Sequence, residues 1–163
     1  MSEPLLLVDV DGVISLFGFD PTAPPAGRYE MVEGIAHLLS ATAGDHLRAL
    51  AEMFQLVWCT GWEEKAAEYL PRALGLPEIP HLSFDRNPGH ASAHWKLAAI
   101  DAYAGADRPL AWVDDAHDER CHRWAQERPG PSLLLSTDPA VGLTAGHVEE
   151  LLQWAHSLCP AAA

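Results

Sequence analysis

The chain contains four apolar runs of strand length. Segments whose apolar residues have helical spacing lie between these runs and after the last one. The runs are rich in branched and aromatic residues and cover residues 5–8, 55–59, 110–113 and 132–135. Continuous apolar character of this kind is typical of parallel strands that are buried on both faces. Helices are expected over residues 46–53, 62–74, 93–103, 117–128 and 145–156. The alternation predicts an α/β fold, a three-layer Rossmann-like parallel sheet with helices on both faces.

The region between the first and second runs has a different pattern. Residues 17–27 hold three prolines and two glycines and are expected to form a loop. Residues 28–32 alternate polar and apolar, as a half-exposed strand does, and residues 35–39 either return as its hairpin partner after Gly34 or form a helix. Further along, Pro71 is expected to kink the helix over residues 62–74 or end it early. Residues 81–84 are expected to form a short strand and residues 85–90 a turn.

The composition fits a single globular domain over residues 1–163. Of its 163 residues 48% are hydrophobic, and neither a linker nor a repeat divides the sequence, so one core can form. No apolar run reaches the length of a membrane span, and the start of the chain lacks the positive charge of a secretory signal. The cysteines Cys59, Cys121 and Cys159 lack metal-ligand spacing and are expected to be reduced thiols of a cytoplasmic protein.

The formal net charge of −13 disfavours general binding to nucleic acids or to anionic membranes through long-range attraction. It is compatible with a locally positive pocket and with a bound cation. The nine histidines raise the question of zinc. His117 and His122 do not share a helix face well, however, and the sequence has no strict metal motif, so both are expected at the surface.

Polar residues follow three of the apolar runs at the point where each run ends. Asp9 and Asp11 follow the first run, Thr60 the second, and Asp114 and Asp115 the third. Parallel strands bring their carboxyl ends to one edge of the sheet, where ligands bind. Lys96 precedes the last acidic pair, although it could be an ordinary surface lysine. Acids, a hydroxyl group and a lysine together suit phosphoryl transfer, in which one carboxylate attacks phosphorus, a second moves protons and others hold Mg²⁺.

These residues fall in four motifs whose order resembles that of the haloacid dehalogenase superfamily of phosphohydrolases. The motifs are Asp9-Val10-Asp11-Gly12-Val13, the strand end Thr60-Gly61, Lys96, and the strand end Asp114-Asp115 with Asp118 behind it. Relatives usually carry threonine where this chain has Val13. The resemblance implies a phosphatase in which Asp9 is the nucleophile and forms an aspartyl-phosphate. Asp11 would protonate the leaving oxygen and then activate water.

The resemblance also implies how phosphate and metal are held. Thr60 and the backbone amides near Gly12 and Gly61 would bind phosphate oxygens, and Lys96 would neutralise charge that develops during transfer. The cofactor Mg²⁺ would bind Asp9, the Asp11 carbonyl and Asp115, with Asp114 as a further ligand or a neighbour. Asp118 would orient the residues that hold the metal, or it would only be an acidic residue in the first turn of a helix, where the helix dipole favours it. Thr60 could also cap the helix that follows it.

The substrate is expected to be an extended or nucleotide-like phosphomonoester. The segments between the motifs are too short for a substantial cap domain, so the site would be open. Trp62 and Trp95 would form a platform for a flat group of the substrate, or they would pack in the core or at the rim. A phosphorylated nucleotide or nucleic-acid end is one candidate partner, although the net charge counts against it.

Two other functions remain open, a receiver-like signalling module and a catalytically inactive phosphate-binding interaction module. Receivers place their lysine last and their acidic pair at the first strand. Here Lys96 precedes Asp114 and Asp115, which favours the hydrolase. The inactive module is disfavoured because every residue that the chemistry needs is present.

Overall fold

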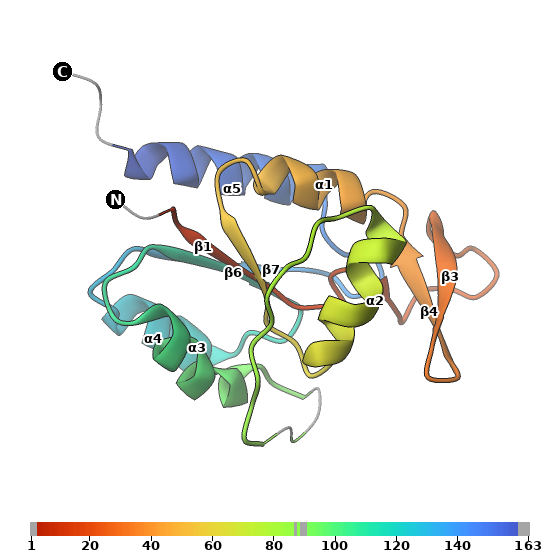
Figure 1. Ribbon diagram of the computed structural model, residues 1–163, viewed down its shortest axis with the longest axis horizontal. Coiled ribbons are helices and arrows are strands. Elements are labelled where there is room, and N and C mark those ends of the chain that lie inside the picture. The colour runs from red at the N-terminus through yellow and green to blue at the C-terminus, as the bar shows by residue number, and fades with distance from the viewer. Residues whose placement is uncertain (1–2, 87, 89–90, 160–163) are drawn as a thin grey trace.

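The fold is built on a parallel sheet of four strands, in a computed structural model that describes residues 3–86, 88 and 91–159. The strands lie in the order β5 (Gln55–Trp58), β1 (Leu5–Val8), β6 (Leu110–Asp114) and β7 (Ser132–Ser136). All neighbouring pairs are parallel (Figure 1). The predicted α/β fold is confirmed, and β1 has a hydrogen-bonded neighbour on each side.

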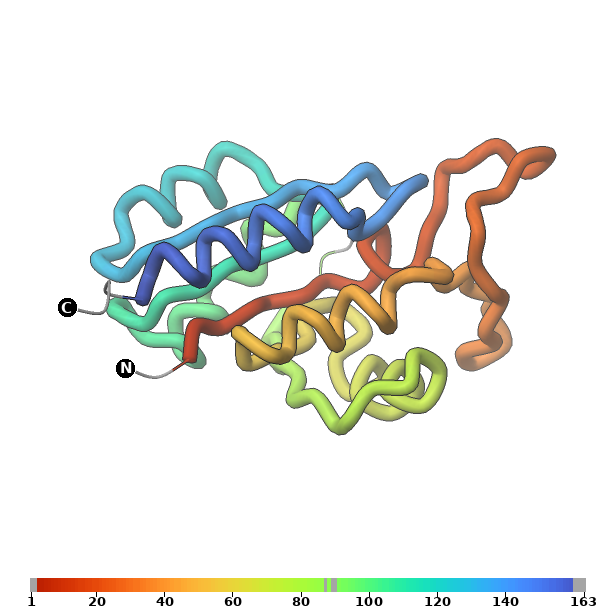
Figure 2. The backbone as a smooth tube through the Cα atoms, turned by 90° about the horizontal axis from the view of Figure 1, so that it is seen from above, coloured from red at the N-terminus to blue at the C-terminus, as the bar shows by residue number. Residues whose placement is uncertain are grey.

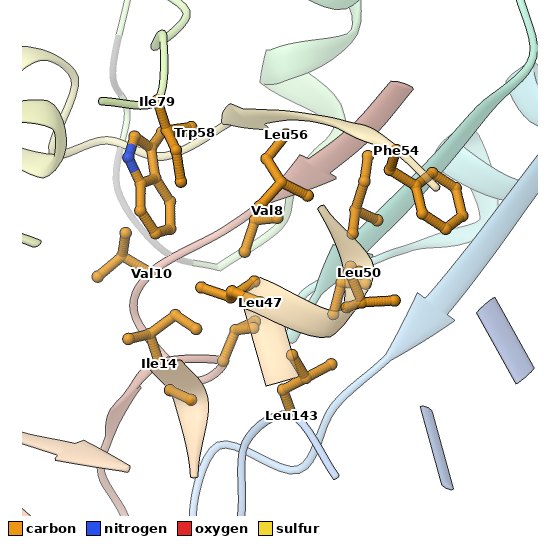
Figure 3. Close-up of a cluster of buried hydrophobic side chains, with 14 of the residues drawn as sticks. Val8, Val10, Ile14, Leu47, Leu50, Phe54, Leu56, Trp58, Ile79 and Leu143 are labelled. Carbon is orange, nitrogen blue, oxygen red and sulfur yellow. The ribbon is translucent and has the colours of Figure 1, made fainter. Parts of the chain in front are cut away.

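Helices cover both faces of this sheet, which explains why its strands are apolar throughout. In Figure 1, α1 (Ala43–Leu50) and α5 (Ala145–Leu158) lie on one face, and α3 (Leu97–Ala104) and α4 (Glu119–Glu127) lie on the other. Successive side chains of a strand point to opposite faces. Leu6 and Val8 therefore join the cluster around Leu47 and Leu50 that Figure 3 shows, whereas Leu5 and Leu7 pack with Ile100.

A second, antiparallel sheet follows β1 directly. It holds β2 (Ser15–Leu16), β4 (Ile35–Ser40) and β3 (Gly27–Val32), in that order. We call it sheet B. Glu33 and Gly34 both have positive φ, as the two central residues of a type I′ hairpin turn require. The hairpin alternative for residues 35–39 is confirmed and the helix alternative is wrong, because this turn sends the chain straight back along β3.

Sheet B stands beyond the carboxyl ends of the parallel strands. In Figure 2 it projects at the end of the molecule opposite to where β1 begins and α5 ends. Sheet B and α1 fill the chain between Asp11 and the strand β5, and α2 (Glu64–Leu74) with a loop fills the described chain between Gly61 and η1 (His94–Lys96). Within the described residues neither segment forms a cap domain, as the segment lengths predict.

The helix α2 continues past Pro71, so the expectation that proline ends it early is wrong. The helix ends at Gly75, whose φ of 66° is left-handed and whose amide donates to the Pro71 carbonyl. Arg48 donates to the carbonyls of Leu74 and Gly75 at 2.8 and 2.9 Å, and Arg28 donates to that of Ala73. Side chains from α1 and β3 thus satisfy the last carbonyls, which would otherwise be left without partners.

Several element boundaries differ from the predicted ones. The segment 81–84 contributes only a bridge between Trp58 and His81 rather than a strand. The helix expected from residue 93 begins with the 3₁₀ turn η1 before α3. The expected turn over residues 85–90 includes 87, 89 and 90, which lie outside the described residues. No helix in the described parts of the chain is both long enough and apolar enough to cross a membrane.

Candidate active site

The three polar strand ends meet at one edge of the parallel sheet. Sheet hydrogen bonding continues to this edge, since the Asp9 amide donates to the Val113 carbonyl at 3.1 Å and the Cys59 amide to that of Val8 at 2.8 Å. A small cavity opens there. Its lining includes eight residues predicted for the site or its rim, together with Ser92, Ala93 and Ala116. The eight are Asp9, Asp11, Thr60, Gly61, Trp95, Lys96, Asp114 and Asp115.

Lys96 is the cation at the centre of this cavity. Its Nζ lies 3.3 Å from Asp9 Oδ1 and 2.6 Å from Asp114 Oδ2, and it donates to the Cys59 carbonyl at 3.1 Å. The residue is 4% exposed, so the surface-lysine alternative is wrong. Burial by itself lowers the pKa of Lys96, but Asp9 and Asp114 outweigh that effect and raise the pKa above its usual value. Lys96 is therefore a fixed positive charge against Asp9.

Asp9 is a buried carboxylate with one oxygen already engaged. Its Oδ1 accepts the Val10 amide at 2.8 Å and lies 3.3 Å from Lys96 Nζ, and the side chain of Asp9 also pairs with that of Asp115. Burial raises the pKa of Asp9 well above its ordinary value, Lys96 opposes this effect, and Asp114 adds to it. Burial and Asp114 likewise raise the pKa of Asp115 to about 6. Among the described residues that line the cavity, Lys96 is the one lysine beside four acidic side chains.

The excess of carboxylates fits a divalent cation. Asp9, Asp114 and Asp115 each offer an oxygen, and these atoms lie within 4.8 Å of one another. Carboxylate oxygens are the hard ligands that Mg²⁺ prefers. Asp114 has both oxygens engaged, one by Lys96 and the other by the Ala116 amide at 2.9 Å. Asp9 and Asp115 are therefore better placed than Asp114 to serve as direct ligands.

Gly12 brings the backbone of the first motif against Asp115. A Cβ atom built on Gly12 would lie 2.3 Å from Asp115 Oδ2, and the φ of Gly12 is +81°. Side chains at this position would both collide with the acid and strain the backbone. The glycine of the first motif is thus required by close packing with the fourth motif.

Asp11 is half-buried and is held apart from the other carboxylates. The strand ends at Val8, so Asp11 does not continue an extended face with Asp9. Its Oδ2 accepts the indole N–H of Trp62 at 3.1 Å. The predicted platform residue Trp62 thus points its polar edge at Asp11. The sequence carries no local signal of this pairing, because 51 positions separate the two residues.

Thr60 is buried and caps the turn before α2 rather than the helix itself. Its Oγ1 accepts the Trp62 amide at 3.1 Å, whereas the N-cap residue of α2 is Glu63, which makes no side-chain cap bond. The Thr60 hydroxyl can still donate its own proton toward the cavity. The expectation that Thr60 caps the following helix is therefore wrong, whereas its role in binding phosphate stays a prediction.

Asp118 both caps a helix and braces the segment that carries Lys96. Its Oδ1 accepts the Cys121 amide at 3.1 Å at the start of α4, and its Oδ2 accepts from Ser92 and lies 2.7 Å from His94 Nδ1. The Ala93 amide also donates to the Ala116 carbonyl at 2.9 Å. Sequence reasoning missed Ser92 and His94, for which neither spacing nor periodicity gives a signal.

The remaining aromatic and histidine residues of the region lie as follows. Trp95 lines the cavity and packs edge-on against Phe84, with ring centroids 4.7 Å apart. His122 is exposed as expected, but the ring of His117 is half-buried against Trp112 at a centroid distance of 4.5 Å. Burial lowers the pKa of His117 to about 4. The expectation of a surface His117 is therefore wrong, because the ring serves as packing for Trp112.

Comparisons with known proteins give similar structures but no similar sequence. No protein-family model and no curated protein matches the chain. One similar structure, described as a haloacid dehalogenase superfamily (subfamily III A) hydrolase from Legionella pneumophila, has 15% identity and a TM-score of 0.47, and the match covers 95% of this chain and 84% of that one.

A second similar structure is described as a 3-deoxy-D-manno-octulosonate 8-phosphate phosphatase from Vibrio cholerae, with 17% identity, a TM-score of 0.45 and coverage of 98% and 88%. A third, described as a YrbI family phosphatase from Pseudomonas syringae pv. phaseolica, has 15% identity, a TM-score of 0.44 and coverage of 95% and 85%. The first description names the superfamily that the four motifs resemble, and the other two name phosphatases.

Proposed function

We propose that the protein is a magnesium-dependent phosphatase that hydrolyses phosphomonoesters through an aspartyl-phosphate on Asp9. The observation that carries this proposal is the buried Lys96, which bridges Asp9 and Asp114 in a cavity that also holds Asp11, Thr60 and Asp115. A carboxylate nucleophile, a second carboxylate for proton transfer and a fixed cation are the groups that phosphoryl transfer to an aspartate needs.

In the first step, a carboxylate oxygen of Asp9 attacks phosphorus, and the bond between phosphorus and the leaving oxygen breaks. Asp11, held by Trp62 at the cavity rim, gives its proton to that oxygen, so the alcohol leaves neutral. Lys96 Nζ lies 3.3 Å from Asp9 Oδ1. Its positive charge stabilises the negative charge as that charge shifts from the Asp9 carboxylate to the phosphoryl group.

In the second step, water attacks phosphorus and the bond to Asp9 breaks, which releases inorganic phosphate. Asp11, now a carboxylate, takes a proton from this water and is ready for the next cycle. Thr60 and the backbone amides near Gly12 and Gly61 are proposed to hold the phosphoryl oxygens in both steps.

Asp9, the Asp11 carbonyl and Asp115 would hold the magnesium ion, with Asp114 directing Lys96 from behind. When bound, Mg²⁺ supplies positive charge that offsets the carboxylates and the transferring phosphoryl group. Burial, with a further contribution from Asp114, raises the pKa values of Asp9 and Asp115. A bound cation would favour the ionised forms of both groups, which supports this proposal.

The substrate is proposed to be an extended phosphomonoester, with a nucleotide or nucleic-acid end as one candidate. Within the described residues no cap domain covers the cavity, so a small substrate gains few contacts beyond its phosphate. Trp95 lies at the cavity and Phe84 beside it, which gives a flat group of the substrate an aromatic surface. The three free cysteines agree with a reducing compartment, and we propose the cytoplasm.

The test is a substrate panel assayed with Mg²⁺ and again with a chelator. Sugar phosphates, mononucleotides, end-phosphorylated oligonucleotides and phosphopeptides are compared by kcat/KM. Magnesium-dependent turnover of any of them supports the phosphatase, and a preference for a small sugar phosphate would overturn the proposal of an extended substrate. A long-lived phosphoryl group on Asp9 without turnover would instead support a receiver-like module.

A further inference from the structure

We infer that Trp62 and His37 are positioning residues that aim the Asp11 carboxylate for proton transfer, and that sheet B is thereby part of the catalytic machinery. This inference rests on the proposed function, because it assigns the support of the acid–base residue in that reaction. It concerns two residues, Trp62 and His37, that lie outside the four motifs. Neither residue has a role in the chemistry that the motifs imply.

The contacts form a closed ring of four residues. Trp62 Nε1 donates to Asp11 Oδ2 at 3.1 Å, and the Trp62 ring meets the His37 ring at a centroid distance of 4.6 Å and an interplanar angle of 61°. His37 Nδ1 lies 3.0 Å from Ser15 Oγ. Ser15 contacts the first motif again. It forms a β-bridge with Asp11, and the Ser15 carbonyl accepts the Gly12 amide at 2.8 Å.

These four contacts fix both the backbone and the carboxylate of Asp11. Ser15 holds the backbone of Asp11 through the pairing of β2 with the first motif, and Trp62 holds the carboxylate. His37 on β4 connects these two anchors, because it packs on Trp62 and meets the Ser15 hydroxyl. The Trp62 amide also donates to Thr60 Oγ1 at 3.1 Å, so one residue ties the second motif to the acid of the first.

The chemistry of the indole suits this task. An indole N–H only donates, so it can hold one oxygen of Asp11 through both steps without taking part in the proton exchange. The other oxygen is left to give and receive the proton in the cavity that Asp11 lines. Proton transfer depends on close and aligned geometry, so a carboxylate that rotates freely would serve poorly.

Packing alone does not explain this use of Trp62. Trp58 and Trp112 are buried in the core, and their indole N–H groups have no partner among the described residues. Trp62 is only half-buried, where water could serve its N–H, yet that N–H is directed at a carboxylate of the candidate site. The orientation of Trp62 is therefore better accounted for by Asp11 than by the core.

The decisive experiment uses the leaving group as the readout. Trp62→Phe keeps an aromatic ring against His37 but removes the donor to Asp11. Nitrophenolate leaves without help from an acid, whereas an alkoxide needs a proton. With Mg²⁺ present, we expect kcat/KM for an alkyl phosphate to fall about 10- to 100-fold in Trp62→Phe, as expected for a misplaced catalytic group. The value for p-nitrophenyl phosphate should fall much less.

Trp124→Phe is the matched control. Trp124 Nε1 donates to Asp101 Oδ1 at 2.9 Å, an indole–carboxylate bond of the same kind that lies outside the cavity. This variant should leave both substrates unaffected. His37→Phe, which keeps a ring but removes the contact with Ser15, should show the same leaving-group dependence to a smaller degree. It also provides the test if Trp62→Phe does not fold.

Two results would overturn the inference in distinguishable ways. A wild-type protein that hydrolyses neither these esters nor any member of the substrate panel would reject the proposed function and this inference with it. Wild-type turnover, combined with equal losses for both esters in Trp62→Phe and His37→Phe or no loss in either, would reject the positioning role alone.

Discussion

Lys96 and Asp114 form an ion pair of 2.6 Å whose side chains are 5% and 1% exposed. Lys65 and Glu33 form a pair of the same length whose side chains are 43% and 55% exposed. The chain thus offers two pairs that match in chemistry and distance and differ in burial. Removing one partner of a buried pair leaves an uncompensated charge, whereas an exposed pair is replaced by water.

Lys96→Met should therefore lower the free energy of unfolding by about 3–5 kcal/mol, since Asp9 and Asp114 lose their common cation. The measurement is urea unfolding of the metal-free protein at neutral pH. Lys65→Met is the control and should leave the unfolding midpoint unchanged. Equal losses in the free energy of unfolding in the two variants would show that the buried Lys96 pair contributes no more to stability than the exposed Lys65 pair.

Asp9→Asn should abolish turnover while leaving the fold intact. The amide keeps the shape of the side chain but cannot attack phosphorus. Burial raises the pKa of Asp9, which means that the charged form is costly at this position. A neutral amide avoids that cost, so we expect no loss of thermal stability in the metal-free protein. Turnover near the wild-type rate in a folded variant would exclude an aspartyl-phosphate on Asp9.

Magnesium should raise the melting temperature of the wild-type protein, and Asp115→Asn should reduce that rise. A ligand that binds only the folded state stabilises it, so the melting shift reports metal binding without any assay of activity. Asp107→Asn removes an exposed acid outside the cavity and controls for the loss of negative charge. An unchanged magnesium shift in Asp115→Asn would remove Asp115 from the proposed metal ligands.

His117 should make the protein less stable as the pH drops from 6.5 to 4, whereas Asp115, whose pKa is raised to about 6 in the folded protein, acts in the opposite direction over part of this range. The ordinary His117 pKa of 6.5 falls to about 4 in the folded protein because the ring is buried. In that window the unfolded chain binds a proton that the folded chain does not, so lowering the pH favours unfolding. The stability that a neutral His117 provides is present above pH 6.5 and is lost below pH 4.

His117→Gln isolates this contribution from that of the carboxylates. The free energy of unfolding is measured for both proteins across the window. As the pH falls, the wild-type protein should lose stability relative to the variant, and the difference between the two slopes against pH should correspond to at most one bound proton per molecule. Parallel curves would mean that His117 titrates alike in the folded and unfolded chains.

The parallel sheet and its site could be predicted because their signals are local. Each strand is a continuous apolar run, and each site acid or hydroxyl stands at a strand end, so topology alone brings Asp9, Thr60 and Asp114 together. The hairpin at residues 35–39 is ambiguous in sequence, because its apolar spacing fits both structures. The antiparallel pairing of β3 with β4, through a turn in which Glu33 and Gly34 have positive φ, settles it.

Contacts between distant segments could not be predicted. Trp62 and Asp11 are 51 positions apart, and His94 and Asp118 are 24 apart, with no periodic pattern to link them. Pro71 misled for a related reason: the helix ends only at Gly75, where Arg48 from α1 and Arg28 from β3 bind its last carbonyls. In each case tertiary partners decide what the local sequence leaves open.

Asp9 and Asp11 are supported by two separate sheets, and this has a consequence for how the protein responds to heat. Asp9 follows a strand that is hydrogen-bonded on both sides in the core, whereas Asp11 is tied to sheet B, whose edge strand exposes Tyr29 and Met31. Exposed elements open at lower free energy than the core. On warming, hydrolysis of alkyl esters should therefore fade before hydrolysis of activated esters, and both should fade before the core melts.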